Sequence, residues 1–134
     1  LTAANISPVH PECCEIYPVR LAAAVTAGQA AYQLTDGTFG VADANDSGKE
    51  QFRGIYLRAA AAGQVTDLLI RGEVYGFTVA AVNTDAILYL SNTAGTLADS
   101  AGTMTVNCGR VTALTDGTPT RVVYIAADWL RAWS

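Results

Sequence analysis

The side chains that most often carry out chemistry are few in this chain. His10 is the only histidine, and it stands between Val9 and Pro11. A hydrolytic triad needs a nucleophile, a base and an orienting group in contact, and the base is commonly an imidazole. One histidine in a proline-flanked segment does not predict such a triad, so we expect no catalytic residue here.

Carboxylates are available as general acids and bases, but most of them stand among turn-forming residues. The set comprises Asp36, Asp43, Asp46, Glu50, Asp85, Asp99 and Asp116. In turns, Asp side chains accept hydrogen bonds from nearby backbone N–H groups. We therefore interpret these residues as turn residues. A small hydrolase would instead require two of them to face each other across a cleft.

Metal and phosphate sites are not predicted. Cys13, Cys14 and Cys108 lack the C-x-x-C spacing of zinc sites, and a single histidine accompanies them. Residues 43–50 match neither the alternating ligands of a calcium loop nor a phosphate loop, since Glu50 follows Lys49 where Ser or Thr is needed. We expect no metal, no cofactor, and cysteines that serve as small half-buried thiols.

The composition argues against several classes of partner. The chain has 134 residues, of which 51% are hydrophobic and 15% charged, and its net charge is −4. Without a basic stripe it does not suit nucleic acid. No apolar run approaches the roughly 20 residues that cross a bilayer, and the first residues lack a signal-peptide layout, so we expect a protein that is soluble in the cytoplasm when made. Lys49 is the only lysine, and Arg is the cation favoured in protein interfaces.

An internal repeat is the clearest feature of organisation. Residues 28–43 align without a gap with residues 84–99, an offset of 56. Beyond Asp99 the offset becomes 55, which aligns Gly54 with Gly109 and residues 65–70 with 120–125. The sequence therefore predicts two similar units of about 55 residues, 18–72 and 73–127.

Each unit contains short apolar segments rich in Val, Ile, Leu and Tyr, separated by turn formers at 35–38, 92–95 and 115–118. Such a pattern is typical of strands joined by hairpins, because Gly readily adopts the positive φ of tight turns. Tyrosines in strand-like segments favour packing within a sheet; these are Tyr32, Tyr56, Tyr75, Tyr89 and Tyr124. We predict a mostly β, small barrel-like domain over residues 21–134.

Residues 1–20 lie outside the repeat and contain three prolines, each of which disfavours helix at the residue before it. We predict an extended N-terminal arm without regular secondary structure, which docks on a partner rather than on its own domain. Its contact residues would be Ile6, Pro8, Val9, Pro11, Ile16 and Tyr17.

The end of the chain suggests one short helix. Asp128 precedes Trp129 and Trp133, which are spaced i, i+4 and would share a helix face. Two indoles at the end of a small domain either fold back over it or engage a neighbour. For the second case the inter-subunit contacts would be Trp129, Leu130 and Trp133.

Residues 25–125 resemble a known family in several stretches. These are VTAGQAAYQLTDGTFGVADA, then GIYLRAAAAGQVTDLLIRGEV, then LYLSNTAGTLADSAG followed by CGRVTAL. They are similar to bacteriophage capsid decoration (cement) proteins, the small proteins that coat an icosahedral head. The two tryptophans and the Cys13-Cys14 pair match no pattern of that family.

The resemblance implies a non-enzymatic virion protein with a β-tulip domain. Members of that family form homotrimers at the three-fold and quasi-three-fold axes of the expanded capsid, on its outer surface, with an arm reaching onto the major capsid protein. The alternative is a carbohydrate-binding or host-attachment β module, which would need exposed aromatic side chains on one sheet face.

Overall fold

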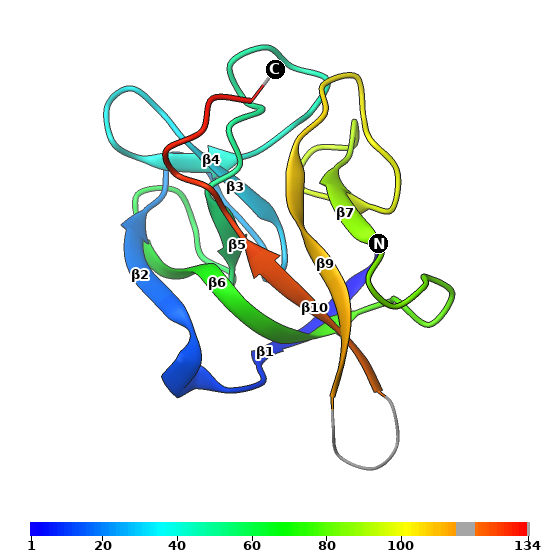
Figure 1. The fold of residues 1–134 in the computed structure, drawn as a ribbon. Helices are drawn as coiled ribbons and strands as arrows, with labels where there is room; N and C mark the ends of the chain where they lie inside the picture. The colour runs from blue at the N-terminus through cyan, green and yellow to red at the C-terminus, as the bar shows by residue number, and fades with distance from the viewer. Residues whose placement is uncertain (115–119, 134) are drawn as a thin grey trace.

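The computed structural model describes residues 1–114 and 120–133, and within them nearly all regular structure is β. One short 3₁₀ turn, η1 (Pro11–Cys13), accompanies the strands. The strands are β1 (Ala3–Pro8), β2 (Glu15–Arg20), β3 (Ala30–Gln33), β4 (Phe39–Val41), β5 (Gly54–Tyr56), β6 (Val65–Phe77), β7 (Ile87–Leu90), β8 (Leu97–Ala98), β9 (Asn107–Leu114) and β10 (Thr120–Ala126). They form one curled antiparallel sheet, a half-barrel (Figure 1). The predicted mostly β, barrel-like class is confirmed.

The long strand β6 joins the two parts of this sheet. Leu68 is opposite both Tyr17 of β2 and Tyr56 of β5, so β2 and β5 lie on opposite edges of β6. Arg71 is opposite both Glu15 of β2 and Ala126 of β10, which puts β10 on the edge that β5 uses. The first part of β6 therefore belongs to β4-β3-β5-β6-β2, and its second part to β8-β7-β9-β10-β6-β1.

These two half-sheets confirm the repeat strand for strand. In the first, β3 pairs with β4 and β5, and β5 pairs with β6. In the second, β7 pairs with β8 and β9, and β9 pairs with β10. The turn at 115–118 lies outside the described residues, but the strands on either side of it pair as expected. The unit boundary at residues 72 and 73 falls inside β6, which serves both units.

Two glycines at the same place in each unit support this equivalence. A Cβ atom on Gly54 would meet the backbone oxygen of Leu69, and one on Gly109 would meet the backbone oxygen of Tyr124. Both the glycines and the residues they approach are related by the offset of 55. Only Gly fits where a neighbouring backbone approaches so closely.

The N-terminal segment is part of the sheet, so the prediction of a separate arm without regular structure is wrong. β1 and β2 pair in succession along one edge of β6, separated by η1 (Figure 1). The N–H of Val9 donates to the carbonyl of Glu73 at 2.9 Å within the interruption. The prolines do not prevent this pairing, because Pro8 ends β1, Pro11 lies in η1 and Pro18 is exposed within β2.

The predicted C-terminal helix is absent from the described residues. Residues 127–133 instead form an irregular segment that lies back over the first half-sheet. Gln51 holds it in place, because its Nε2 donates to the carbonyl of Trp133 and its Oε1 accepts the N–H of Trp133, both at 2.8 Å. A helix this short has little stability of its own. The contacts with Gln51 therefore stabilise the irregular segment more than the i, i+4 pair of tryptophans would stabilise a helix.

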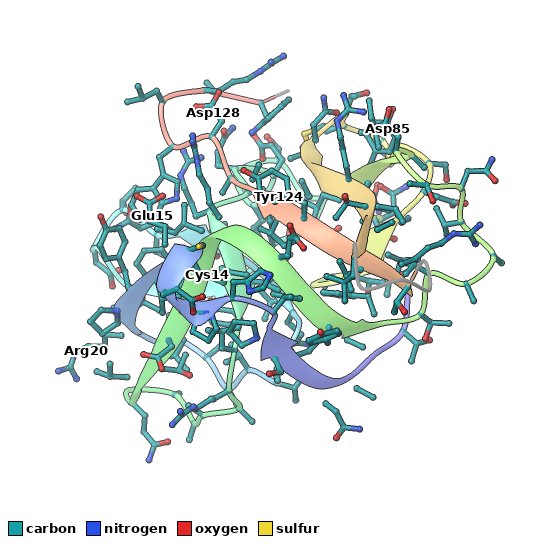
Figure 2. All side chains as sticks on the ribbon, turned by 60° about the horizontal axis from the view of Figure 1, so that its bottom comes forward. Cys14, Glu15, Arg20, Asp85, Tyr124 and Asp128 are labelled. Atoms are coloured by element: carbon teal, nitrogen blue, oxygen red, sulfur yellow. The ribbon has the colours of Figure 1, made fainter. Side chains whose placement is uncertain are left out.

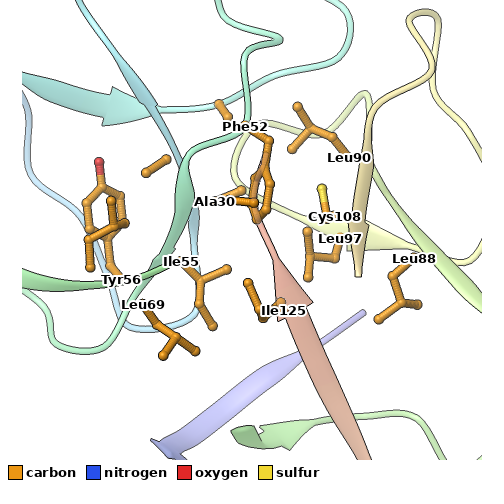
Figure 3. Close-up of a cluster of buried hydrophobic side chains, with 14 of the residues drawn as sticks. Ala30, Phe52, Ile55, Tyr56, Leu69, Leu88, Leu90, Leu97, Cys108 and Ile125 are labelled. Atoms are coloured by element: carbon orange, nitrogen blue, oxygen red, sulfur yellow. The ribbon is translucent and has the colours of Figure 1, made fainter. Parts of the chain in front are cut away.

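A single core lies between the two half-sheets. Phe52, Ile55 and Tyr56 from the first unit are fully buried, as are Leu88 and Leu90 from the second. Figure 3 shows Phe52 and Ile55 facing Leu90, Leu97 and Ile125 across this core. The hydroxyl of Tyr56 donates to the carbonyl of Gly40 at 2.5 Å, which satisfies the one polar atom of that side chain.

Candidate functional site

Six large apolar side chains are exposed among the described residues. The set comprises Tyr17, Val65, Tyr75, Tyr124, Trp129 and Leu130. Tyr17 is 49% exposed, Trp129 38% and Leu130 100%. Tyr17 and Trp129 are in contact, since their rings lie edge to face with centroids 6.4 Å apart. The structure thus brings together Tyr17 and Trp129, which the sequence assigned to different partner contacts.

Tyr17, Trp129 and Leu130 border a groove of about 410 Å³ between β2, β6 and the C-terminal segment. We call it the C-terminal groove, and its lining is Glu15, Tyr17, Ile70, Arg71, Ala127, Asp128, Trp129 and Leu130. Figure 2 shows Glu15 and Asp128 on the same side of the molecule. Aromatic, acidic and basic side chains therefore share one open hollow.

Trp129 is fixed by three neighbours. Its Nε1–H donates to the carbonyl of Arg53 at 2.9 Å, and its ring packs against Phe39 at a centroid distance of 6.2 Å as well as against Tyr17. A ring held by a hydrogen bond and two aromatic contacts loses little further freedom when a ligand binds to it. Trp129 is thus preorganised at the rim of the groove.

Asp128 shapes the turn that presents Leu130. Its Oδ1 accepts the N–H of Leu130 at 3.1 Å, and its carbonyl accepts a hydrogen bond from Arg53 Nη1 at 3.3 Å. Burial lowers the pKa of the Arg53 guanidinium, and the Asp128 carboxylate opposes that shift. The turn leaves the Leu130 side chain entirely in water.

Glu15 and Arg71 are the notable charged pair of the groove. They are directly opposite each other in the β2–β6 pairing, which puts their side chains on the same face of the sheet. Apart from the backbone pairing of the two strands, neither side chain forms a hydrogen bond or an ion pair with any described residue. A carboxylate and a guanidinium are therefore both available to a ligand.

A second exposed surface adjoins the groove. Tyr124 is opposite Arg110 of β9 and Glu73 of β6, so the three side chains share one face, and Tyr75 follows two residues after Glu73. Arg110 forms an ion pair with Asp85 at 3.2 Å. We call Tyr75, Tyr124, Glu73 and Arg110 the tyrosine face; Figure 2 shows Tyr124 on β10.

The other predicted contact residues have mixed positions. Ile6 and Ile16 pack against the domain's own core, Pro8 and Val9 are half-buried, and Pro11 is exposed. Trp133 is only 7% exposed, with Arg131 stacked over its ring at 4.0 Å, so it contacts its own chain. Sequence reasoning missed Glu15, Arg71 and Asp128 as site residues. The pairing of β2 with β6 brings Glu15 to Arg71, and the C-terminal segment lying back over the first half-sheet brings Asp128 to them.

Hydrogen bonds confirm the turn interpretation for Asp36 and Asp43, whereas the Asp85 carboxylate pairs with Arg110 and that of Asp46 with Lys49. The Asp36 carboxylate accepts hydrogen bonds from the hydroxyl and from the backbone N–H of Thr38. Both bonds lower the pKa of Asp36, and the bond from the hydroxyl has the larger effect. Asp43 accepts the N–H of Asn45 at 2.9 Å. Asp116 lies outside the described residues. His10 is exposed, and its Nδ1 lies 3.9 Å from Oε1 of Glu12.

The three cysteines are free thiols in different environments. Cys13 is exposed, Cys14 is half-buried and Cys108 is buried. Burial, with the nearby Cys13 and Glu12, raises the pKa of Cys14, and burial alone raises that of Cys108. Among the described residues, no three His, Cys, Asp or Glu side chains gather as metal ligands.

A further hollow of about 460 Å³ lies at the end of β6, lined by Phe77, Thr78, Val79, Ala80, Thr84 and Arg121. Among its described lining residues, the charged one is Arg121, which already donates to the carbonyl of Ala80. The C-terminal groove, with its unpaired charges and exposed rings, is therefore the better candidate site.

Comparison with known proteins gives no relative. No protein-family model matches the chain, and neither a curated protein nor a solved structure matches it. In the described part of the chain, no helix is long and apolar enough to cross a membrane.

Proposed function

We propose that this protein is a non-enzymatic structural protein that binds the outer surface of a phage capsid. It stabilises the shell by bridging subunits of the major capsid protein, and it acts on the virion as a homotrimer. The resemblance of residues 25–125 to capsid decoration proteins supports this proposal. The β domain with two similar units is consistent with it.

The observation that carries the proposal is the exposed apolar surface around Leu130. A folded domain seldom leaves a leucine completely exposed beside exposed aromatic rings unless that surface contacts something. Trp and Tyr are the residues most often found at the energetic centre of protein interfaces. Leu130, Trp129 and Tyr17 are accordingly the proposed contact with a protein subunit, in place of the separate arm expected from the sequence.

Many weak contacts suffice for such a role. A trimer binds through three copies of each contact, and linked contacts raise the overall affinity far above that of one site. Each copy can therefore use a modest surface, such as the one around Leu130.

The test is electron microscopy of the protein mixed with expanded phage capsid shells. We expect trimeric density at the three-fold positions and a drop in occupancy of about tenfold for Leu130→Asp. The matched control is Val65→Asp, which alters another exposed apolar residue at the far end of β6 and should leave occupancy unchanged. Undecorated shells, or a monomer both free and on the shell in sedimentation, would overturn the proposal.

A further inference from the structure

The charges of the C-terminal groove restrict what can bind there. Glu15 and Asp128 repel an anion, and Arg71 repels a cation. A wholly apolar ligand would take water from the unpaired Glu15 and Arg71 without replacing its hydrogen bonds, which is costly. A neutral ligand that both donates and accepts hydrogen bonds suits all three charged groups.

The aromatic side chains add a second requirement. Tyr17 and Trp129 present exposed ring surface beside the charged groups, and Trp129 is fixed by Arg53 and Phe39. Ring faces carry partial negative charge and attract the weakly positive C–H groups of a flat, partly apolar ligand. The ligand should therefore have a C–H face as well as hydroxyl groups.

From these features together we propose that the C-terminal groove binds a neutral saccharide. A pyranose ring has an apolar C–H face that stacks on Tyr17 or Trp129, and hydroxyls that donate to Glu15 and Asp128 and accept from Arg71. The groove volume of about 410 Å³ lies within the range of roughly 300–1,000 Å³ usual for small-ligand pockets.

Five of the groove residues take part in this binding. Tyr17 and Trp129 supply the stacking surface, whereas the Glu15 carboxylate and the Arg71 guanidinium fix the orientation of the hydroxyls. Asp128 uses Oδ1 for the N–H of Leu130, which leaves its other oxygen for the sugar. The inference does not depend on the capsid proposal, because it uses the chemistry of the groove and is tested on the free protein. The two proposals share Tyr17 and Trp129, so a copy bound to a shell through these rings does not bind a saccharide at the same time.

The first experiment screens the intact chain against immobilised glycans. The neutral probes are maltohexaose, cellohexaose and chitohexaose, and the acidic probes are sialyllactose and polygalacturonate. We expect at least one neutral probe to bind and both acidic probes to bind about tenfold more weakly or not at all. An oligo-arginine peptide is included as a cationic probe, and its binding in place of the sugars would overturn the proposal.

The second experiment measures the affinity of the neutral probe by calorimetry for two groove variants. Tyr17→Ala should weaken binding about tenfold and Glu15→Gln about fivefold, since each removes one contact. The matched controls on the tyrosine face, Tyr75→Ala and Glu73→Gln, should change affinity less than about twofold. Binding should also change the tryptophan fluorescence, because Trp129 lines the groove.

The outcomes separate the two proposals. If no neutral saccharide binds, or if the control variants weaken binding as much as the groove variants, the saccharide site is wrong whatever the capsid result. If Tyr17→Ala does not fold, the affinity of the isosteric Glu15→Gln variant still tests the saccharide site. This variant should fold, because the Glu15 side chain is exposed and has no partner in the described structure.

Discussion

Gly54 and Gly109 hold equivalent positions in the two units. In each case the backbone of the next strand approaches the place where a Cβ atom would lie. We expect Gly54→Ala and Gly109→Ala to lower the free energy of unfolding by roughly 1–3 kcal/mol each, because the added Cβ would force the paired strands apart. Urea denaturation followed by circular dichroism measures this. Gly37→Ala is the control, since nothing lies within 4 Å of its Cβ position and only its φ of 90° opposes the change. Equal losses at all three positions would refute the steric argument.

Two buried acids make stability depend on alkaline pH. Burial raises the pKa of the Cys108 thiol well above 9.0, and burial, with Tyr32 adding to it, raises that of the Tyr56 phenol above 10.0. The unfolded chain ionises at these ordinary values while the folded chain stays neutral. The contribution to stability is therefore complete below these ordinary values, and it is lost progressively as the pH rises from them toward the raised pKa values of the folded chain.

We accordingly expect the urea midpoint to fall between about pH 8 and pH 10. Cys108→Ala should be less stable at neutral pH, because it leaves a small cavity, but its midpoint should fall less steeply over the same range. Parallel pH profiles for the two proteins would show that Cys108 does not contribute to the dependence.

At the scale of elements, the N-terminal strands decide whether β6 is complete. Removing residues 1–17 would delete β1 and half of β2, uncover one edge of β6 and expose the core contacts of Ile6 and Ile16. We expect the truncated chain to lose most of the roughly 5–15 kcal/mol that stabilises a domain. The measurement is a thermal melt followed by circular dichroism, and an unchanged melting temperature would mean that the segment is dispensable for folding.

The C-terminal segment presents one residue to solvent and anchors another. Trp133→Ala should lower the free energy of unfolding by about 3 kcal/mol, because the indole is buried and its backbone bonds to Gln51 depend on its position. Leu130→Ala should change it by less than about 0.5 kcal/mol, because Leu130 is fully exposed. Urea denaturation of both variants tests this, and a larger loss for Leu130→Ala would contradict the arrangement.

The sequence predicts structure formed by neighbouring residues well, and it misses contacts between residues that are far apart in the chain. The hairpin at residues 35–38 has turn residues between apolar segments, and β3 and β4 form as expected. The pairing of β2 with β6 joins residues about fifty positions apart, and nothing in residues 15–20 signals it. The groove depends on that pairing, so Glu15 and Arg71 could not be linked beforehand. The prediction of a C-terminal helix was wrong for the same reason, since the contact between Gln51 and Trp133 joins residues that are far apart in the sequence.

For the whole molecule, the two units are similar in strand pairing but are not independent domains. Both half-sheets contain part of β6, and the buried side chains of both units form one continuous core. Neither unit can keep its sheet and its buried surface without the other. The repeat thus produces one folding unit with two similar halves, and the groove lies where the end of the second half meets the first.

This arrangement predicts a single cooperative unfolding transition. Ile55→Ala in the first unit and Leu90→Ala in the second should each shift it by about 2–5 kcal/mol, since both residues are fully buried. Tryptophan fluorescence reports on the C-terminal segment packed over the first unit, and amide hydrogen exchange of β7 and β9 reports on the second. Because β6 couples the units, each substitution should shift both signals equally. If Leu90→Ala destabilised β7 and β9 while the tryptophan signal kept its original midpoint, the units would be separate domains and the shared role of β6 would be wrong.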